Sequence, residues 1–65
     1  MTELEKGNYE EIVALGIATE EELNLVHALA GGTWTDTIDA VCYVRTGYRT
    51  FAQFYEEEIV EEEEY

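Results

Sequence analysis

The stretch TEEELNLVHALAGG, residues 19–32, contains the signals of a complete helix and decides the fold class. Thr19 with Glu22 three positions later forms a capping box, in which a hydroxyl and a carboxylate satisfy each other's backbone amides. The glutamates of this first turn also face the positive end of the helix dipole. Two adjacent glycines lose too much backbone entropy to stay helical, so the helix is predicted to end at Gly31. Its predicted apolar stripe consists of Leu23, Val26, Leu29 and Ala30.

Further helices are predicted on both sides of this one. Residues 8–15 carry apolar side chains at helical spacing, and Gly16 follows where a helix-ending residue is expected. A downstream helix begins after Thr33 or Thr35 and ends at Gly47. Its β-branched and aromatic residues make a strand the competing assignment, but a period of about 3.6 residues fits better than alternation. We expect this to be the central core helix, with an apolar face of Trp34, Ile38, Val41 and Cys42.

The C-terminal part combines a helix start with a block of negative charge. Thr50 and Gln53 form a second capping box, followed by an aromatic face. Glutamate has good helix propensity, so we expect this fourth helix to continue to about Glu62 when its charge is neutralised. The predicted core therefore covers about residues 8–56, and the predicted acidic tail covers about residues 57–65.

Length and composition limit the class of protein. The 65 residues carry 16 acidic and 3 basic side chains, which gives a net charge of -13. Strongly acidic chains are often disordered, but 46% of this chain is hydrophobic and aromatic residues occur throughout it. We therefore predict a single all-α domain over residues 1–65, a compact fold of three to four helices with an acidic C-terminal extension. A core of this size leaves a thin stability margin, which favours a homodimer.

Most other classes of protein lack the residues that they need here. No apolar stretch is long enough to span a membrane and no secretory signal is found, so we expect a cytoplasmic protein. A single cysteine excludes an internal disulfide, and the ligands of a structural zinc site are missing. The acidic residues lack the spacing of a calcium-binding loop, so no metal or cofactor site is predicted.

Only Cys42 and His27 could together support nucleophilic catalysis. Cys42 falls on an apolar helix face, where an inert buried thiol is the ordinary interpretation. His27 falls beside the core boundary, where a structural or solvent-facing role is expected. We therefore predict that the protein is not an enzyme.

The acidity itself suggests a binding function. A chain at -13 is repelled by DNA and by anionic membranes, but to a nucleic-acid-binding protein its carboxylates resemble a phosphate backbone. Residues 56–64 carry seven carboxylates, so as an α-helix they would place one charge per roughly 1.9 Å, close to the roughly 1.7 Å of duplex DNA. The alternative is a solvated charged surface that only keeps a small protein soluble.

In length, acidity, helical pattern and interleaved aromatic residues, the chain resembles the small anti-restriction and anti-CRISPR proteins of phages and mobile elements. The resemblance implies an inhibitor that acts by DNA mimicry or by occlusion of a DNA-binding surface. The implied partner is a host restriction enzyme or CRISPR effector with a basic nucleic-acid-binding surface, and neither nucleic acid nor a membrane is bound directly. The candidate partner-binding residues are Glu20, Glu21, Glu22, Asp36, Asp39, Tyr48, Tyr55, Glu56, Glu57, Glu58, Glu61 and Glu62.

A second resemblance concerns the fold. It rests on the run Ile12-Val13-Ala14-Leu15-Gly16-Ile17 together with Leu25, Ala28, Leu29, Gly32 and Ala40-Val41. This spacing resembles that of ubiquitin-associated domains, compact three-helix folds with a loop similar to Met-Gly-Phe, where this chain has Leu15-Gly16-Ile17. The resemblance implies a three-helix core, with a protein-interaction module as the alternative functional class.

The three cations, Lys6, Arg45 and Arg49, have an expected structural role. We expect them to pair with nearby glutamates and with the carbonyl end of the third helix, which reduces charge repulsion. Tyr48 lies between the two arginines, so a small recognition loop is the competing interpretation.

Overall fold

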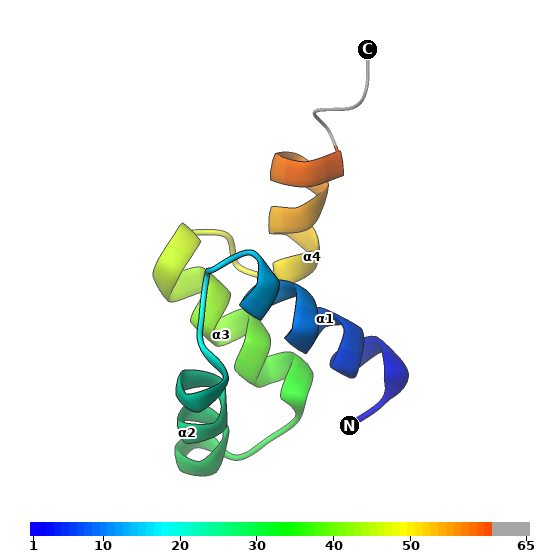
Figure 1. Ribbon diagram of the computed structural model, residues 1–65. Coiled ribbons are helices and arrows are strands. Elements are labelled where there is room, and N and C mark those ends of the chain that lie inside the picture. Colours follow the sequence, from blue (N-terminus) through cyan, green and yellow to red (C-terminus); the bar gives the residue numbers. More distant parts are fainter. Residues whose placement is uncertain (61–65) are drawn as a thin grey trace.

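The computed structural model describes residues 1–60, which form four α-helices and one π-helical segment, with no strand in that range (Figure 1). The elements are α1 (Glu3–Ala14), α2 (Glu20–Ala30), α3 (Trp34–Thr46), α4 (Phe51–Phe54) and the π-helical segment η1 (Tyr55–Val60). The prediction of an all-α fold is confirmed. The predicted acidic tail covers about residues 57–65, of which residues 61–65 lie outside the described residues.

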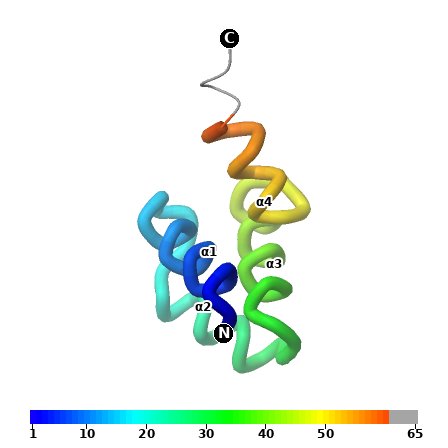
Figure 2. The backbone as a smooth tube through the Cα atoms, turned by 90° about the vertical axis from the view of Figure 1, so that its right-hand side faces the viewer, coloured from blue at the N-terminus to red at the C-terminus, as the bar shows by residue number. Residues whose placement is uncertain are grey.

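The central element is α3, as the sequence predicted. It packs against α1, α2 and α4, and Figure 2 shows α1 and α2 on one side of it and α4 across its C-terminal end. Trp34, predicted to lie in the core, is only half-buried at the N-terminal end of α3. The buried apolar residues are Ile12, Ala18, Leu23, Ile38, Val41, Cys42 and Phe51.

All four α-helices begin after a threonine. In each case the threonine hydroxyl accepts a hydrogen bond from the backbone amide three residues later, which satisfies one of the amides left open at a helix start. Three of these starts were predicted, and Thr33 rather than Thr35 is the cap of α3. The capping residues are Thr2, Thr19, Thr33 and Thr50.

The first helix starts at Glu3, so the prediction of a start near residue 8 is wrong. Thr2 and Glu5 form a complete capping box, with the Glu5 amide 3.1 Å from the Thr2 hydroxyl and the Thr2 amide 2.9 Å from the Glu5 carboxylate. Leu4, the apolar residue nearest to this start, is exposed and adds nothing to the core. The apolar periodicity therefore begins later than the helix does.

The two predicted capping boxes form only in part. The hydroxyls of Thr19 and Thr50 cap their helices, but the reciprocal partners are used elsewhere. Glu22 pairs with Arg45 of α3. The Gln53 side-chain amide donates to a Glu57 carboxylate oxygen 3.5 Å away.

The predicted stripe of α2 is also only partly buried. Leu23 is in the core and Val26 is half-buried, whereas Leu29 and Ala30 are exposed. Leu29 is 79% exposed, so no element within residues 1–60 covers its side chain. Figure 1 shows α2 at the end of the bundle opposite to α4.

The fourth helix begins after Thr50, as predicted, and helical geometry continues through η1 to Val60, where the described residues end. After α3, Gly47 adopts a left-handed conformation with φ of 89°, which an L side chain rarely adopts, and the chain turns toward α4. An Asp39 carboxylate oxygen accepts a hydrogen bond from the Phe51 amide at 2.9 Å and so fixes the start of α4 against α3. The α-helical geometry ends after Phe54, and the π-helical segment carries the first glutamates of the acidic run.

Candidate protein-binding surfaces

The charges of the chain are segregated along the sequence. Residues 1–22 contain seven glutamates and Lys6, a net charge of -6. Residues 51–65 contain seven glutamates and no cation, a net charge of -7. Residues 23–50 contain two aspartates and two arginines, so their net charge is zero. The negative charge therefore belongs to the two ends of the chain and not to its middle.

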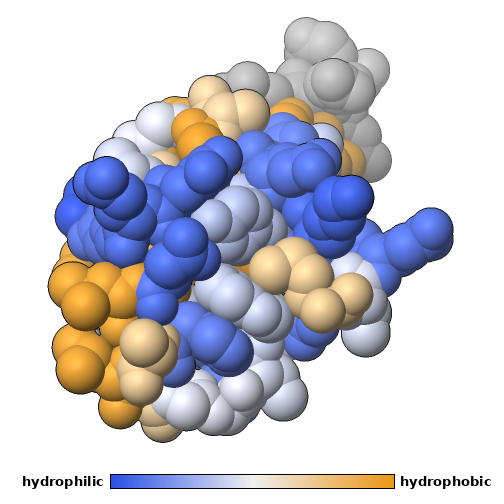
Figure 3. All heavy atoms as spheres, turned by 60° about the horizontal axis from the view of Figure 1, so that its bottom comes forward, coloured by the Kyte–Doolittle hydropathy of each residue, from blue (hydrophilic) through white to orange (hydrophobic). Residues whose placement is uncertain are grey.

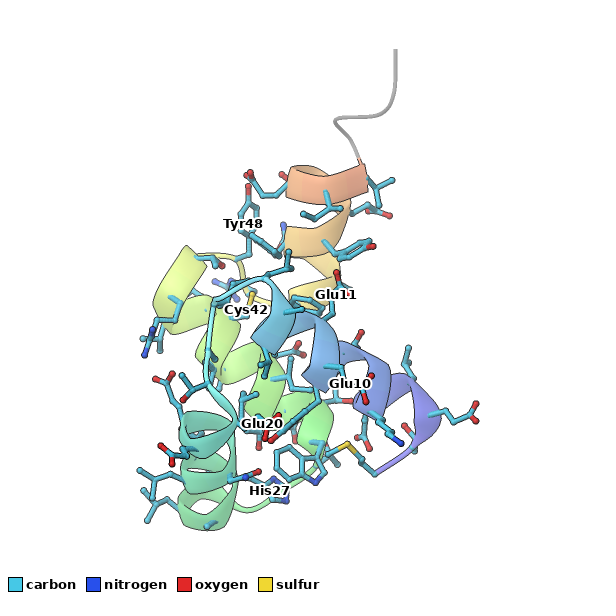
Figure 4. All side chains as sticks on the ribbon, in the orientation of Figure 1. Glu10, Glu11, Glu20, His27, Cys42 and Tyr48 are labelled. Atoms are coloured by element: carbon cyan, nitrogen blue, oxygen red, sulfur yellow. The ribbon has the colours of Figure 1, made fainter. Side chains whose placement is uncertain are left out.

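The two acidic ends meet at a groove of about 420 Å³ between α1 and the α4–η1 segment. We call this the acidic groove. Glu11 of α1 and Glu56 of η1 line it, and neither carboxylate has a hydrogen-bond or ion-pair partner within residues 1–60. Figure 4 shows Glu11 next to the start of α4, whereas Glu10 lies farther down α1. The other lining residues are Leu4, Gly7, Asn8, Phe51, Ala52, Tyr55 and Val60.

The acidic groove combines uncompensated charge with apolar surface. Leu4 is 73% exposed and Val60 is also exposed, while the buried ring of Phe51 contributes to the lining. Among residues 1–60, no lysine or arginine lines the groove. Such a site complements a segment that carries both cationic and apolar side chains, since the apolar contacts exclude water from the charge pairs.

Two of the predicted partner-binding glutamates in η1 already have intramolecular partners. The Tyr48 hydroxyl donates to a Glu58 carboxylate oxygen at 2.6 Å, and the Tyr48 ring packs edge-on against Phe54 with ring centroids 5.8 Å apart. Glu57 accepts from Gln53. Of the predicted binding residues at this end, Tyr55 and Glu56 line the groove, and Tyr48 and Glu58 hold η1 in place. Glu61 and Glu62 lie outside the described residues.

The first turn of α2 contains both paired and unpaired carboxylates. Glu20 and Glu21 are exposed, and their carboxylates have no hydrogen-bond or ion-pair partner within residues 1–60. Glu22 forms an ion pair with Arg45, whose guanidinium also donates to the Ile17 carbonyl at 3.3 Å. The expected pairing of Arg45 with a glutamate is therefore confirmed.

The other two cations, Lys6 and Arg49, form no ion pair within residues 1–60. Their expected pairing with a nearby glutamate stays a prediction.

The two predicted aspartates have different environments. Asp36 is exposed in the first turn of α3, where its negative charge interacts favourably with the positive end of the helix dipole. Asp39 accepts the hydrogen bond from the Phe51 amide and is half-buried, so its role is structural. The structure therefore does not bring Asp36 or Asp39 into the acidic groove.

An aromatic cluster joins the three long helices. The Trp34 ring stacks on His27 with centroids 3.9 Å apart and meets the edge of Tyr9 at 5.4 Å. The Tyr9 hydroxyl donates to the Asn24 side chain at 3.3 Å, and His27 Nδ1 lies 3.0 Å from the hydroxyl of the buried Thr37. Desolvation and the nearby Glu20 carboxylate raise the pKa of Tyr9. His27 therefore has a structural environment at the core boundary.

Cys42 and His27 have different hydrogen-bond partners, Thr46 for the thiol and Thr37 for the imidazole. Figure 4 shows them at different levels of the bundle, with His27 on α2 and Cys42 near the α3–α4 turn. The Cys42 thiol is fully buried, 3.4 Å from the Thr46 hydroxyl, and burial raises its pKa. A raised pKa disfavours the thiolate, which is the reactive form.

Glu5 links the N-terminal turns of α1 and α3. Its carboxylate accepts from the Thr35 amide at 3.2 Å and from the Thr35 hydroxyl at 3.1 Å, in addition to the Thr2 amide. Hydrogen bonds from the Thr2 and Thr35 backbones, with help from the Thr35 hydroxyl, lower the pKa of Glu5. This carboxylate is therefore engaged within the fold.

No group of three or more histidine, cysteine or acidic side chains within residues 1–60 is arranged to hold a metal ion. A search of residues 1–60 for a membrane-spanning helix finds no candidate.

Sequence reasoning missed the α1 side of the acidic groove. Leu4, Asn8 and Glu11 follow one another at spacings of four and three residues, which places them on one helix face. This spacing indicates a shared helix face only if the helix starts at Glu3. With the predicted start near residue 8, Leu4 lies outside the helix and the shared face cannot be recognised.

Comparison of the chain with protein-family models, with characterised proteins and with solved structures gives no match.

Proposed function

We propose that this chain is an acidic protein-binding inhibitor that covers the basic nucleic-acid-binding surface of a partner, such as a host restriction enzyme or CRISPR effector. The observation that carries the proposal is the meeting of both acidic segments at one groove. Each segment contributes an unpaired glutamate to that groove, Glu11 from one and Glu56 from the other.

The chemistry of a nucleic-acid-binding surface fits this groove. Such a surface presents lysine and arginine side chains that otherwise contact phosphates. These cations would face Glu11 and Glu56, and an apolar side chain beside them would contact Leu4 and Tyr55. The net charge of -13 would also attract a basic partner over a distance and speed association at low salt.

The proposed mechanism is occlusion rather than a phosphate-by-phosphate copy of DNA. The DNA-like charge spacing predicted for residues 56–64 assumes an α-helical rise, but Tyr55–Val60 is π-helical. Glu57 and Glu58 are also hydrogen-bonded to neighbouring side chains. The inhibitory contribution would therefore come from a negatively charged body that fills the partner's site.

A helical protein-interaction module is the second candidate. It is favoured by the exposed apolar side chains of Leu25, Leu29 and Val44, which an electrostatic inhibitor does not need.

Release of labelled duplex DNA from a panel of purified restriction nucleases and CRISPR effectors tests the proposal. At low salt the chain is expected to displace DNA from at least one member of the panel. The displacement should weaken as salt rises, because salt screens exposed charges. If no member releases DNA at low salt, the inhibitor proposal is wrong and the interaction module is favoured.

Two double variants with equal charge then locate the site. Glu11→Gln with Glu56→Gln removes both groove carboxylates, and Glu20→Gln with Glu21→Gln removes two unpaired carboxylates of α2. Both change the net charge from -13 to -11. The groove variant should lose at least about tenfold more affinity than the control. Equal losses would mean that total charge matters and the groove does not.

A further inference from the structure

A second surface of the molecule is apolar and lies away from the acidic groove. Leu25 and Leu29 of α2 are 60% and 79% exposed, and Tyr43 and Val44 of α3 are 54% and 78% exposed. These four are half of the eight large hydrophobic side chains that are exposed within residues 1–60. Figure 3 shows hydrophobic side chains gathered at the left of that view, where α2 lies. Exposed apolar surface of this kind marks interaction sites in soluble proteins.

Shallow hollows connect these side chains into one surface. Val26 of α2 lines a hollow together with Ala40 and Val44 of α3. Leu25 lines a neighbouring hollow, and both hollows share Glu22 and Arg45. Ala40 also lines a third hollow with Tyr43. Leu29 lies one turn beyond Leu25 and Val26 on α2. We call this surface the neutral face; its residues are Leu25, Val26, Leu29, Ala40, Tyr43 and Val44.

The charge around the neutral face identifies the kind of partner that it fits. The charged side chains that line the hollows of this face sum to -1; they are Glu21, Glu22, Asp39, Arg45 and Arg49. Glu22 is paired with Arg45, and Asp39 accepts a hydrogen bond from the Phe51 amide. A basic partner therefore gains little electrostatic attraction here. Two copies of the chain repel each other mainly through their acidic ends, at -6 and -7, and meet only a small excess of like charge across this face.

We propose that the neutral face joins two copies of this chain into a symmetric dimer. A two-fold arrangement places the same patch of each copy against the other, so the ridge formed by Leu25 and Leu29 packs into the partner's hollow between Val26 and Val44. The acidic groove shares no residue with the neutral face. Each copy in the dimer therefore keeps its groove open.

The charge of the acidic ends determines how dimerisation depends on salt. Apolar contacts hold the dimer together, and long-range repulsion between two copies at -13 opposes it. Added salt screens the repulsion, so dimerisation strengthens as salt rises. Binding of a basic partner at the acidic groove weakens over the same range.

Sedimentation equilibrium of the full chain tests the dimer over protein concentrations from about 5 to about 500 μM, at about 50 and about 500 mM NaCl. We expect a monomer–dimer equilibrium whose dissociation constant falls at the higher salt. A monomer at every concentration in both buffers would overturn the proposal, and the neutral face would then be open to a different protein.

Three variants assign the interface. Leu29→Glu and Val44→Glu each place a charge in the neutral face, and Leu4→Glu makes the same type of change at a comparably exposed leucine of α1. All three have a net charge of -14, so general repulsion is equal. The first two should raise the dissociation constant by at least about tenfold over the Leu4→Glu control. Equal effects of all three would overturn the assignment, and circular dichroism confirms that each variant is folded.

Discussion

The acidic groove and the neutral face are each lined by residues of more than one helical element, but they differ in how their carboxylates are used. At the groove, Glu11 and Glu56 have no partner within residues 1–60. At the edge of the neutral face, Glu22 is paired with Arg45. The comparison shows that the carboxylates of this chain are not equivalent. A carboxylate paired with a cation adds little to the electrostatic field that an approaching protein meets, whereas an unpaired one contributes its full charge.

The core belongs to neither surface and gives the largest expected effect. Ile38→Ala should lower the free energy of unfolding by about 3 kcal/mol, because it removes a buried side chain at the centre of α3 and leaves a cavity. Val44→Ala is the control on the same helix, where the side chain is 78% exposed and the loss should be under about 0.5 kcal/mol. Urea denaturation of both variants measures the difference. Similar losses would mean that the neutral face is part of the core.

The aromatic cluster should show an intermediate effect. Trp34→Ala is expected to cost about 2 kcal/mol, less than for a fully buried tryptophan, because the ring is half-buried between His27 and Tyr9. Trp34→Phe keeps a ring in this place and should recover more than half of the loss. Thermal unfolding followed by circular dichroism gives both values. A negligible loss for Trp34→Ala would show that the cluster does not hold α1, α2 and α3 together.

The paired and unpaired glutamates of α2 provide a smaller and sharper test. Glu22→Gln should destabilise the protein by about 0.5 kcal/mol more than Glu21→Gln, because only Glu22 has an ion-pair partner and both sites are solvent-accessible. The two variants lose the same charge from the same helix turn, so the dipole contribution cancels to first order. The difference should shrink at about 1 M NaCl. A difference that persists at high salt would contradict a screened surface pair.

The smallest effect concerns pH and Glu5. Hydrogen bonds lower the pKa of Glu5 in the folded state, so its carboxylate stabilises the fold above the ordinary glutamate pKa. That stabilisation is lost as the pH falls through the lowered pKa. Glu5→Gln should therefore be less stable than Glu3→Gln at pH 7, and the two should converge toward about pH 3. Unfolding curves at several pH values measure the stability difference between the two variants. A difference that grows as the pH falls would contradict a lowered pKa of Glu5 in the folded state.

The sequence predicted most of the fold because its helix starts are local signals. Thr19, Thr33 and Thr50 could be identified from a few neighbouring residues, and so could Gly47 at the end of α3. The start at Thr2 was missed because an apolar pattern identifies only the helix turns that face the core. The first turn of α1 does not, since its apolar residue Leu4 is exposed.

The surfaces could not be predicted to the same extent, because they depend on contacts between distant residues. The acidic groove requires Glu11 and Glu56 to line the same hollow, and the sequence alone does not bring the α4–η1 segment near α1. The pairing of Glu22 with Arg45 likewise removes one glutamate from a set that looked uniform in the sequence. Leu29 has helical spacing typical of a core residue, yet no described element covers it.

The four threonine caps also bear on how fast the chain finds its fold. Each cap uses a hydroxyl and an amide only three residues apart, so each helix start can form before any long loop is closed. Helical domains dominated by such local contacts fold in microseconds to milliseconds. We expect refolding of this chain in that range, and replacement of a capping threonine by alanine should slow refolding only where that helix is already formed in the transition state.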